Sequence, residues 1–159
     1  MIQTKCNIKG VEIRKLEKFS DERGWLCEFF RQDEIKDGKY PVMSYISATK
    51  PGVSRGPHEH RFQTDYICFP GQSIFKVFLW DNRADSGTFG DSFIFEVKEN
   101  SPTMIIIPPG VVHAYKNIGE IEGMILNAPD RLYAGVNHEE PVDEIRYEEQ
   151  SDNKFKIDD

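Results

Sequence analysis

Histidine side chains that could carry chemistry gather in two short segments of the chain. His58 and His60 are separated by one residue, Asp65 follows them, and His113 lies in a second segment. A neutral imidazole has a pKa suited to removing a proton near pH 7, as general base catalysis requires. Three imidazoles with one carboxylate also form a ligand set for a divalent transition metal. The sequence therefore indicates proton transfer or metal chemistry at one shared site.

The rest of the chain is expected to consist of strands and turns. Short apolar or alternating segments separated by turn residues are typical of a β-sandwich or barrel. Strands are expected at 11–19, 25–30, 42–48, 65–69, 73–80, 92–97, 104–107, 114–117 and 124–128. A short helix is expected at 33–39, and partial order at 144–149 with fraying beyond it.

Length and composition limit the class of protein. The chain has 159 residues and a mass of 18.4 kDa, which fits one domain over 1–159 with a charged tail from about 143. Its net charge of −7 argues against a nucleic-acid polymer as partner, since such binders carry a basic surface. The sequence shows neither an apolar run of membrane-spanning length nor a secretory leader. With three cysteines and no CxxC pair, reduced thiols and a cytoplasmic location are expected.

The two histidine segments resemble the two motifs of the cupin barrels. The first runs Gly52-Val-Ser-Arg-Gly-Pro-His58-Glu-His60 and is followed by Asp65. The second runs Pro108-Pro-Gly110-Val-Val-His113-Ala-Tyr-Lys-Asn117. The resemblance implies an all-β fold, a double-stranded β-helix or jelly roll, with minor short helices. In such barrels His58 and His60 would face the same side of a strand, because side chains alternate along it, and His113 would arrive from an adjacent strand.

A second resemblance narrows the family. The fragments Asp21-Glu-Arg-Gly24, Glu28-Phe-Phe30, Arg55-Gly56-x-His58, Asp81-x-Arg83, Ser86-x-Thr-Phe-Gly90 and Ile107-Pro-x-Gly-x-x-His113 occur in this order. Over about residues 9–141 the chain resembles the dTDP-4-dehydrorhamnose 3,5-epimerase family. The resemblance implies a homodimer with exchanged N-terminal strands and a nucleotide-diphosphate sugar, a 4-keto-6-deoxyhexose, as substrate. It also implies a place in the synthesis of a surface-polysaccharide sugar, as in O-antigen lipopolysaccharide.

The resemblance assigns roles to the residues that match the family motifs. His58 matches the general base that removes the proton next to the ketone. The acid that orients this base stands in an Asp-Pro pair in the family, for which this chain offers Glu140 before Pro141. Arg23 and Arg55 match the arginines that bind the diphosphate, for which a planar guanidinium is suited. Glu28 matches a contact on the nucleotide side.

Two departures from the family lie at the centre of the mechanism. Asp65 stands where the family has a lysine that stabilises the enolate oxygen, and Lys76 stands where it has an aspartate. One interpretation is an exchanged catalytic pair, in which Lys76 reaches the ketone if the two strands are neighbours. The other is an internal ion pair without a catalytic role. His60 is the second candidate for the positive charge and, with His113, is placed among the substrate-binding residues.

The family's second proton donor, a tyrosine, is matched here by Leu126. Leucine cannot donate a proton, so epimerisation is expected at C3, and inversion at C5 is the step that suffers most. Tyr133 lies further along the chain, but a surface position is expected for it. Met43 and Tyr45 stand where the family has Gln and Asn near the nucleotide, so the nucleotide need not be dTDP.

Two other functions stay open beside a cofactor-free epimerase. One is a metal-dependent isomerase or oxygenase, in which His58, His60, Asp65 and His113 hold one divalent metal. The other is a paralogue that binds a nucleotide sugar without catalysis, because the substrate-binding motifs are present while the lysine and the tyrosine are lost.

Overall fold

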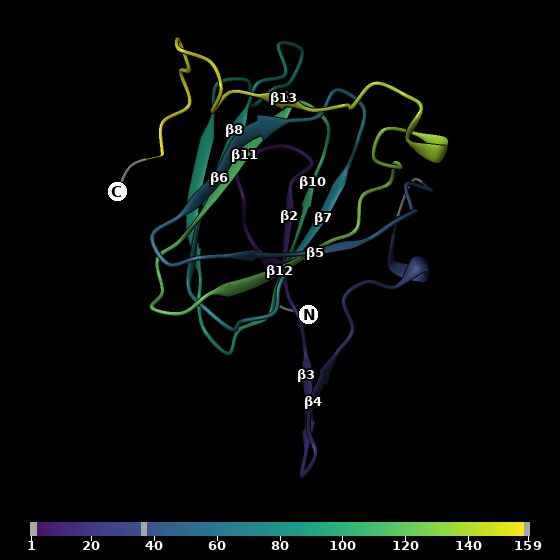
Figure 1. Ribbon diagram of the computed structural model, residues 1–159, viewed down its shortest axis with the longest axis vertical. Coiled ribbons are helices and arrows are strands. Elements are labelled where there is room, and N and C mark those ends of the chain that lie inside the picture. Colours follow the sequence, from purple (N-terminus) through teal and green to yellow (C-terminus); the bar gives the residue numbers. More distant parts are fainter. Residues whose placement is uncertain (1–2, 36–37, 158–159) are drawn as a thin grey trace.

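Two antiparallel sheets face each other across a common core (Figure 1). The computed structural model describes residues 3–35 and 38–157. A six-stranded sheet has the order β1-β2-β10-β7-β12-β5, and a five-stranded sheet has the order β13-β6-β11-β8-β9. From β5 to β13 the chain passes from one sheet to the other at every connection except that between β8 and β9. This is the expected all-β jelly roll.

The strands are short and mostly coincide with the apolar segments of the sequence. In chain order they are β1 Gln3–Thr4, β2 Glu12–Lys15, β3 Lys18–Asp21, β4 Gly24–Cys27, β5 Tyr45–Thr49, β6 Ser54–Glu59, β7 Asp65–Phe69, β8 Phe75–Asp81, β9 Ser92–Val97, β10 Thr103–Ile107, β11 Val111–Asn117, β12 Gly123–Asn127 and β13 Ile145–Arg146. Two 3-10 helices complete the described elements, η1 Gln32–Glu34 and η2 Val136–His138. The strand β6 is missing from the segments expected from the apolar pattern, because it is polar and contains glycine and proline, which strands usually exclude. Only the cupin resemblance placed His58 on a strand.

Inward-facing apolar side chains from both sheets form the main core. They include Ile13, Ile67, Ile105 and Ile125 from the six-stranded sheet and Phe75, Val77, Leu79 and Val111 from the five-stranded sheet. Burying each such side chain contributes about 1.5–3 kcal/mol relative to leaving it exposed. Three polar residues lie two positions from a core residue on β7, β11 and β12 and therefore share its inward face: Asp65, His113 and Asn127. Polar groups thus occupy part of the same interior.

A hairpin of β3 and β4 projects away from the two sheets (Figure 1). Phe19, Trp25 and Leu26 on this hairpin are exposed. The chain that follows packs Phe29 and Ile35 against the outer face of the six-stranded sheet. The expected helix at 33–39 is wrong in extent: Gln32–Glu34 form one 3-10 turn, Ile35 is extended, and residues 36–37 lie outside the described part.

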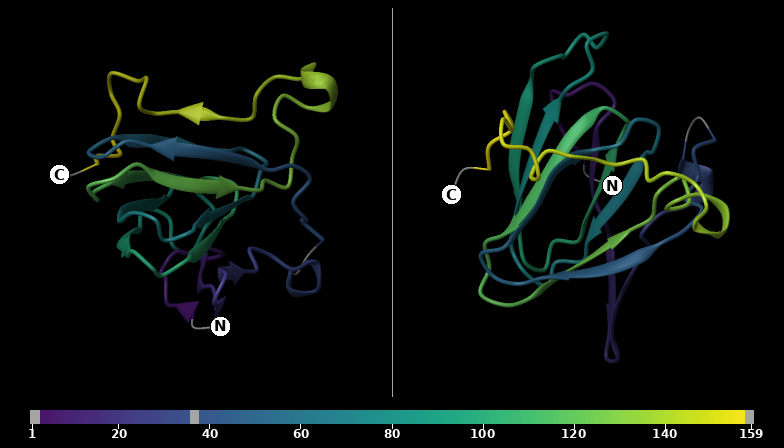
Figure 2. Two further views of the ribbon diagram at one scale, coloured as in Figure 1. Left: turned by 60° about the horizontal axis from the view of Figure 1, so that its bottom comes forward. Right: turned by 45° about the horizontal axis from the view of Figure 1, so that its top comes forward.

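The charged C-terminal tail packs on the five-stranded sheet. β13 pairs with β6 at the sheet edge, and Figure 2 shows this yellow segment running along the sheet. Further on, the buried ring of Phe155 contacts Trp80 and Tyr147, at centroid distances of 5.5 and 4.8 Å. The expected partial order at 144–149 is confirmed, as a strand at Ile145–Arg146, but the expected fraying beyond it is wrong because Phe155 is buried. The unpaired backbone groups of β6 provide hydrogen bonds to a strand that a helix would not use.

Within the described residues, no helix is long and apolar enough to cross a membrane. Cys6, Cys27 and Cys68 are free thiols, as expected. Burial raises the pKa of the Cys68 thiol to about 12, so this sulfur stays protonated and unreactive.

Candidate active site

Three histidines meet where β6 and β11 pair. His58 on β6 lies directly opposite His113 on β11, and their ring centroids are 4.3 Å apart. His60 follows the end of β6, with its ring centroid 5.9 Å from that of His58. Gly56 permits the close approach of the two strands, because a Cβ there would lie 2.6 Å from the carbonyl oxygen of His113. The clustering predicted from the sequence is confirmed.

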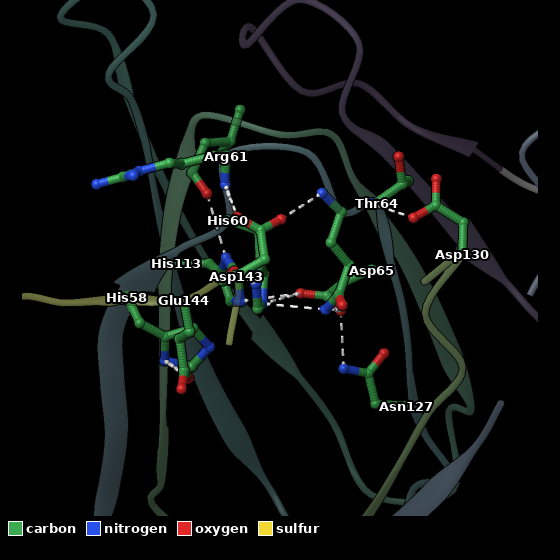
Figure 3. A network of polar contacts seen from close by, with 12 residues as sticks. His58, His60, Arg61, Thr64, Asp65, His113, Asn127, Asp130, Asp143 and Glu144 are labelled. Atoms are coloured by element: carbon green, nitrogen blue, oxygen red, sulfur yellow. Dashed lines mark hydrogen bonds and ion pairs between the residues drawn. The ribbon is translucent and has the colours of Figure 1, made fainter. Parts of the chain in front are cut away.

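A buried carboxylate joins this cluster to the opposite sheet (Figure 3). Asp65, at the start of β7, has Oδ2 3.2 Å from Nε2 of His60 and 3.4 Å from Nε2 of His113. Its Oδ1 accepts hydrogen bonds from the side-chain amides of Gln63 at 2.9 Å and Asn127 at 3.0 Å. Burial alone would raise the pKa of Asp65, but these contacts outweigh it and lower the pKa. Asp65 is therefore an ionised carboxylate that is 1% exposed.

The three imidazoles differ in their affinity for a proton. Burial lowers the pKa of His60, but the hydrogen bond and charge of Asp65 outweigh it and raise the pKa to about 9. Burial, together with the neighbouring His113 and His60, holds the pKa of His58 well below its usual value. Burial also lowers the pKa of His113. At neutral pH the site therefore combines a charged His60 with a neutral His58, which is the form able to accept a proton.

A short loop after His60 is fixed by the C-terminal segment. Nδ1 of His60 contacts the backbone carbonyl of Asp143. The Asp143 carboxylate accepts backbone hydrogen bonds from Arg61, Phe62 and Gln63 at 2.9–3.0 Å. Because both ring nitrogens of His60 are engaged, with Asp143 and with Asp65, its ring is held in place and acts mainly through its charge.

The acid beside His58 is Glu144 and not Glu140, the residue that the family resemblance assigned to this position. Oε1 of Glu144 lies 3.9 Å from Nδ1 of His58, and both side chains are largely buried. Glu140 is exposed and lies against Gly135, so the structure does not bring it to the site. The reason is β13, which pairs Arg146 with His58 and thereby carries Glu144 over the imidazole.

The histidine cluster is also compatible in geometry with a metal ion. Ligand atoms of His58, His60 and His113 all lie within 4.8 Å of one another. Nε2 of His113 is buried and makes no hydrogen bond. Imidazole nitrogens are ligands for zinc, copper, iron and nickel, so these residues fit a transition metal.

Residues 5–150 match the family described as dTDP-4-dehydrorhamnose 3,5-epimerase. The chain belongs to this family. Its members are sugar epimerases, a class of isomerase, so the histidine cluster at the paired strands β6 and β11 is the candidate active site of a nucleotide-sugar epimerase.

Relatives and solved structures agree with this assignment. The chain is 38% identical over 139 residues to the probable low-salt glycan biosynthesis epimerase Agl13 of Haloferax volcanii, covering 87% of this chain and 86% of that protein. It is 38% identical over 113 residues to the spore coat polysaccharide biosynthesis protein SpsL of Bacillus subtilis, covering 71% and 74%. A dTDP sugar isomerase structure from Desulfovibrio desulfuricans has a TM-score of 0.80 at 18% identity, covering 98% of this chain and 94% of that one. This last likeness shows a common fold.

Lys76 does not form the exchanged pair with Asp65. β7 and β8 lie in different sheets, so the condition that the two strands are neighbours is not met. Along β8, Val77 and Leu79 face the core, and Lys76 points to the other side, with Nζ 5.4 Å from the ring centroid of Phe78. The ion-pair partners of Asp65 are His60 and His113, and both interpretations of a Lys76–Asp65 pair are wrong.

On β12 the side chain that faces the site is Asn127. Leu126 is turned to the outer face of the sheet, where it packs beside Cys68 in a second apolar cluster. Asn127 binds Asp65 and also donates a hydrogen bond of 2.8 Å to the hydroxyl of Tyr45 on β5. The sequence-based analysis gave neither Asn127 nor Gln63 a role. The one available signal was the alternation along β12, which places Asn127 on the same face as the core residue Ile125.

Of the predicted substrate-binding residues outside the cluster, only Arg55 lies on a strand of the active site. Its guanidinium donates to Thr49 Oγ1 at 3.1 Å and to the carbonyl of Ala48 at 3.0 Å. Arg23 is at the turn of the projecting hairpin, with its side chain 84% exposed and paired with Asp21. Glu28 follows that hairpin and pairs with Arg31 at 3.3 Å. Neither Arg23 nor Glu28 makes a described contact with the histidines.

Proposed function

We propose that this protein epimerises a nucleotide-linked 4-keto-6-deoxyhexose at C3, with His58 as the base that removes the proton next to the ketone. The observation that carries the proposal is the neutral imidazole of His58 beside the carboxylate of Glu144, in a chain of the epimerase family. A C–H bond next to a carbonyl is acidic because the resulting negative charge moves onto the ketone oxygen as an enolate. A neutral imidazole at hydrogen-bonding distance is a suitable acceptor for such a proton.

Glu144 and Asp65 act on the base from opposite sides of the cluster. Glu144, near Nδ1 of His58, favours a proton on that nitrogen and leaves the Nε2 lone pair to accept the substrate proton. Its negative charge also stabilises the imidazolium that results. The charge of Asp65 is balanced by His60, so the buried carboxylate adds little repulsion toward an enolate formed nearby.

The mode of substrate binding follows from the positions of the arginines. Arg55 lies beside the cluster on β6, the strand of His58, and its guanidinium provides a contact for the diphosphate. Arg23 and Glu28 reach a substrate if the hairpin of one subunit extends to the site of another. The projecting hairpin with its exposed Trp25 and Leu26 supports such a homodimer.

Sedimentation velocity is expected to show a particle of two 18.4 kDa chains. Replacing Trp25 and Leu26 by serine should lower the sedimenting mass toward that of a single chain. The same replacement should weaken nucleotide binding, since the exchanged hairpin would carry Arg23. A wild-type protein that sediments as a single chain would contradict the homodimer.

The names of the two relatives support the biological setting. One is assigned to glycan biosynthesis and the other to spore-coat polysaccharide biosynthesis. We therefore place the reaction in the synthesis of a surface-polysaccharide sugar. A cytoplasmic location fits three free thiols and a nucleotide-activated substrate.

The test is a reaction of the purified protein with dTDP-, CDP- and GDP-linked 4-keto-6-deoxyglucose. Proton coupling constants measured by NMR on the recovered sugars report the configuration at C3 and C5. The proposal predicts a C3 epimer from at least one of the three nucleotides. Tight binding of a nucleotide sugar that is never converted would instead identify a binding protein without catalysis.

A second candidate function is a metal-dependent isomerase or oxygenase. It is favoured by the three imidazoles within 4.8 Å and by the unbonded Nε2 of His113. His58, His60 and His113 would hold the ion, with Asp65 behind them, and the metal would act as a Lewis acid on the ketone oxygen. The two functions differ in the use of His58, because an imidazole bound to a metal cannot serve as a base.

Chelation separates these candidates. We expect that dialysis against EDTA leaves the epimerisation rate within twofold of its starting value, and that metal analysis finds less than one ion per ten chains. The opposite result would be one tightly bound transition metal per chain, with activity lost on chelation and restored by that metal. Such a result would replace the first proposal by the second.

A further inference from the structure

Epimerisation needs two groups, because a proton leaves one face of the carbon and a proton arrives at the other. His58 provides the base on the five-stranded sheet. The position that the family resemblance assigned to the second donor holds Leu126, which has no proton to give and is turned away from the site. A donor must therefore come from elsewhere in the chain or from water.

A tyrosine from the opposite sheet lies next to the site. Tyr45 begins β5 and is paired in register with Asn127 on β12. Its hydroxyl oxygen lies 2.8 Å from Nδ2 of Asn127, and the same nitrogen lies 3.0 Å from Oδ1 of Asp65. Tyr45 is thus one residue away from the buried carboxylate, on the six-stranded sheet, whereas His58 is on the five-stranded sheet.

The contact with Asp65 determines which way the tyrosine proton points. An ionised carboxylate accepts hydrogen bonds only, so Asn127 must turn its NH₂ group, not its carbonyl, toward Asp65. The Tyr45 oxygen faces that same NH₂ group and is therefore the acceptor. The O–H group of Tyr45 can therefore donate its own hydrogen bond in another direction. About half of the residue is exposed, so a substrate at the site can reach it.

The surroundings of Tyr45 also favour the protonated phenol. Burial raises the pKa of Tyr45 to about 12, and the charges of Asp65 and Glu144 act in the same direction. The phenol is therefore protonated at neutral pH, which is the form a general acid requires.

We propose that Tyr45 is the catalytic acid that delivers a proton to the face of the substrate carbon opposite His58. This inference rests on the proposed epimerisation and adds the residue that completes it. His58 takes the proton from C3, and the C–H electron pair forms the enolate. The enolate carbon then takes the O–H proton of Tyr45, forming the new C–H bond on the other face. Water returns a proton to the phenolate and removes one from the imidazolium, so both residues regain their starting forms.

The test compares Tyr45→Phe with Tyr133→Phe in heavy water. Tyr133 is the matched control, since its side chain is exposed and its ring lies near His138, 6.3 Å between centroids. Two rates are measured for each protein by NMR: deuterium entry into the recovered substrate, and formation of the inverted product. Both variants lose one hydroxyl and keep the ring, and nucleotide binding confirms that each is folded.

We expect Tyr45→Phe to lower the rate of inversion by 10²-fold or more, the range known for general acids, while substrate labelling stays within about threefold of wild type. Tyr133→Phe is expected to keep both rates. Unchanged inversion in Tyr45→Phe would overturn the inference, as would a selective loss of inversion in Tyr133→Phe. A Tyr45→Phe protein that binds nucleotide but loses labelling and inversion equally would overturn it too. A wild-type protein that shows no labelling with any sugar would instead refute the proposed function.

Discussion

Replacing His58 by alanine is expected to lower the rate of proton removal from the substrate by 10²–10⁴-fold, the contribution typical of a general base. The imidazole is the only basic group that the account places at the reacting carbon, and its low pKa keeps it neutral at working pH. Nucleotide affinity should stay within about threefold, because we propose that the diphosphate is bound by Arg55 and not by His58. Loss of the substrate C3 proton signal in heavy water gives the first quantity, and calorimetric titration with the nucleotide gives the second.

His138→Ala is the matched control, because this histidine is exposed on η2 and makes no described contact with the cluster. It should retain the full exchange rate. The proton exchange rate of Glu144→Gln should fall between those of His58→Ala and His138→Ala, about tenfold below wild type. The amide keeps the shape of the side chain but not the charge that stabilises the imidazolium. A His58→Ala protein that exchanges the proton at the wild-type rate would show that the base lies elsewhere.

Replacing Asp65 by alanine is expected to reduce the free energy of unfolding by about 3–5 kcal/mol, as is usual when one partner of a buried ion pair is removed. The change leaves His60 without its counter-charge and the amides of Gln63 and Asn127 without their acceptor. Such a loss is a large part of the stability of a domain of this size. Urea unfolding followed by tryptophan fluorescence measures it directly.

Asp85→Ala provides the comparison, since Asp85 is exposed and a surface change of this kind stays within about 0.5 kcal/mol. The pH dependence gives a second readout. The pKa of His60 is raised to about 9, so its pairing with Asp65 stabilises the fold fully below the ordinary histidine pKa and is lost as the pH rises through about 9. Wild type should lose stability over this interval and Asp65→Ala should not. Equal stability of Asp65→Ala and wild type would contradict the ionised carboxylate.

The features predicted from the sequence are those that depend on short-range alternation. His58 and His60 share one side of the chain because they are two residues apart, and the apolar segments at 65–69 and 92–97 form strands with the predicted bounds. The motif around His113 placed it on the strand next to that of His58, which the structure confirms. The family assignment is also confirmed. Its motifs are short fragments that occur in the family order, so they can be recognised in the sequence without knowledge of the fold.

The errors concern residues whose positions depend on long-range pairing. Glu144 reaches His58 only because β13 joins the edge of the five-stranded sheet, and the local sequence of the tail does not specify that partner. The proposed Lys76–Asp65 pair failed because the chain crosses between the sheets after β7, which separation along the sequence cannot reveal. The sequence-based analysis did not consider Tyr45 as a proton donor, because it lies on β5, two strands away from the β7 strand of Asp65, and is linked to that carboxylate only through Asn127.

Solvent deuterium incorporation, read by NMR at C3 and C5 of the nucleotide-linked 4-keto-6-deoxyglucose, decides whether His58 removes the substrate proton. We expect label at C3 with the wild-type protein, no such label with His58→Ala, and no effect of EDTA on the labelling. Label that persists in His58→Ala, or that disappears with EDTA and returns with one metal, would contradict proton abstraction by His58.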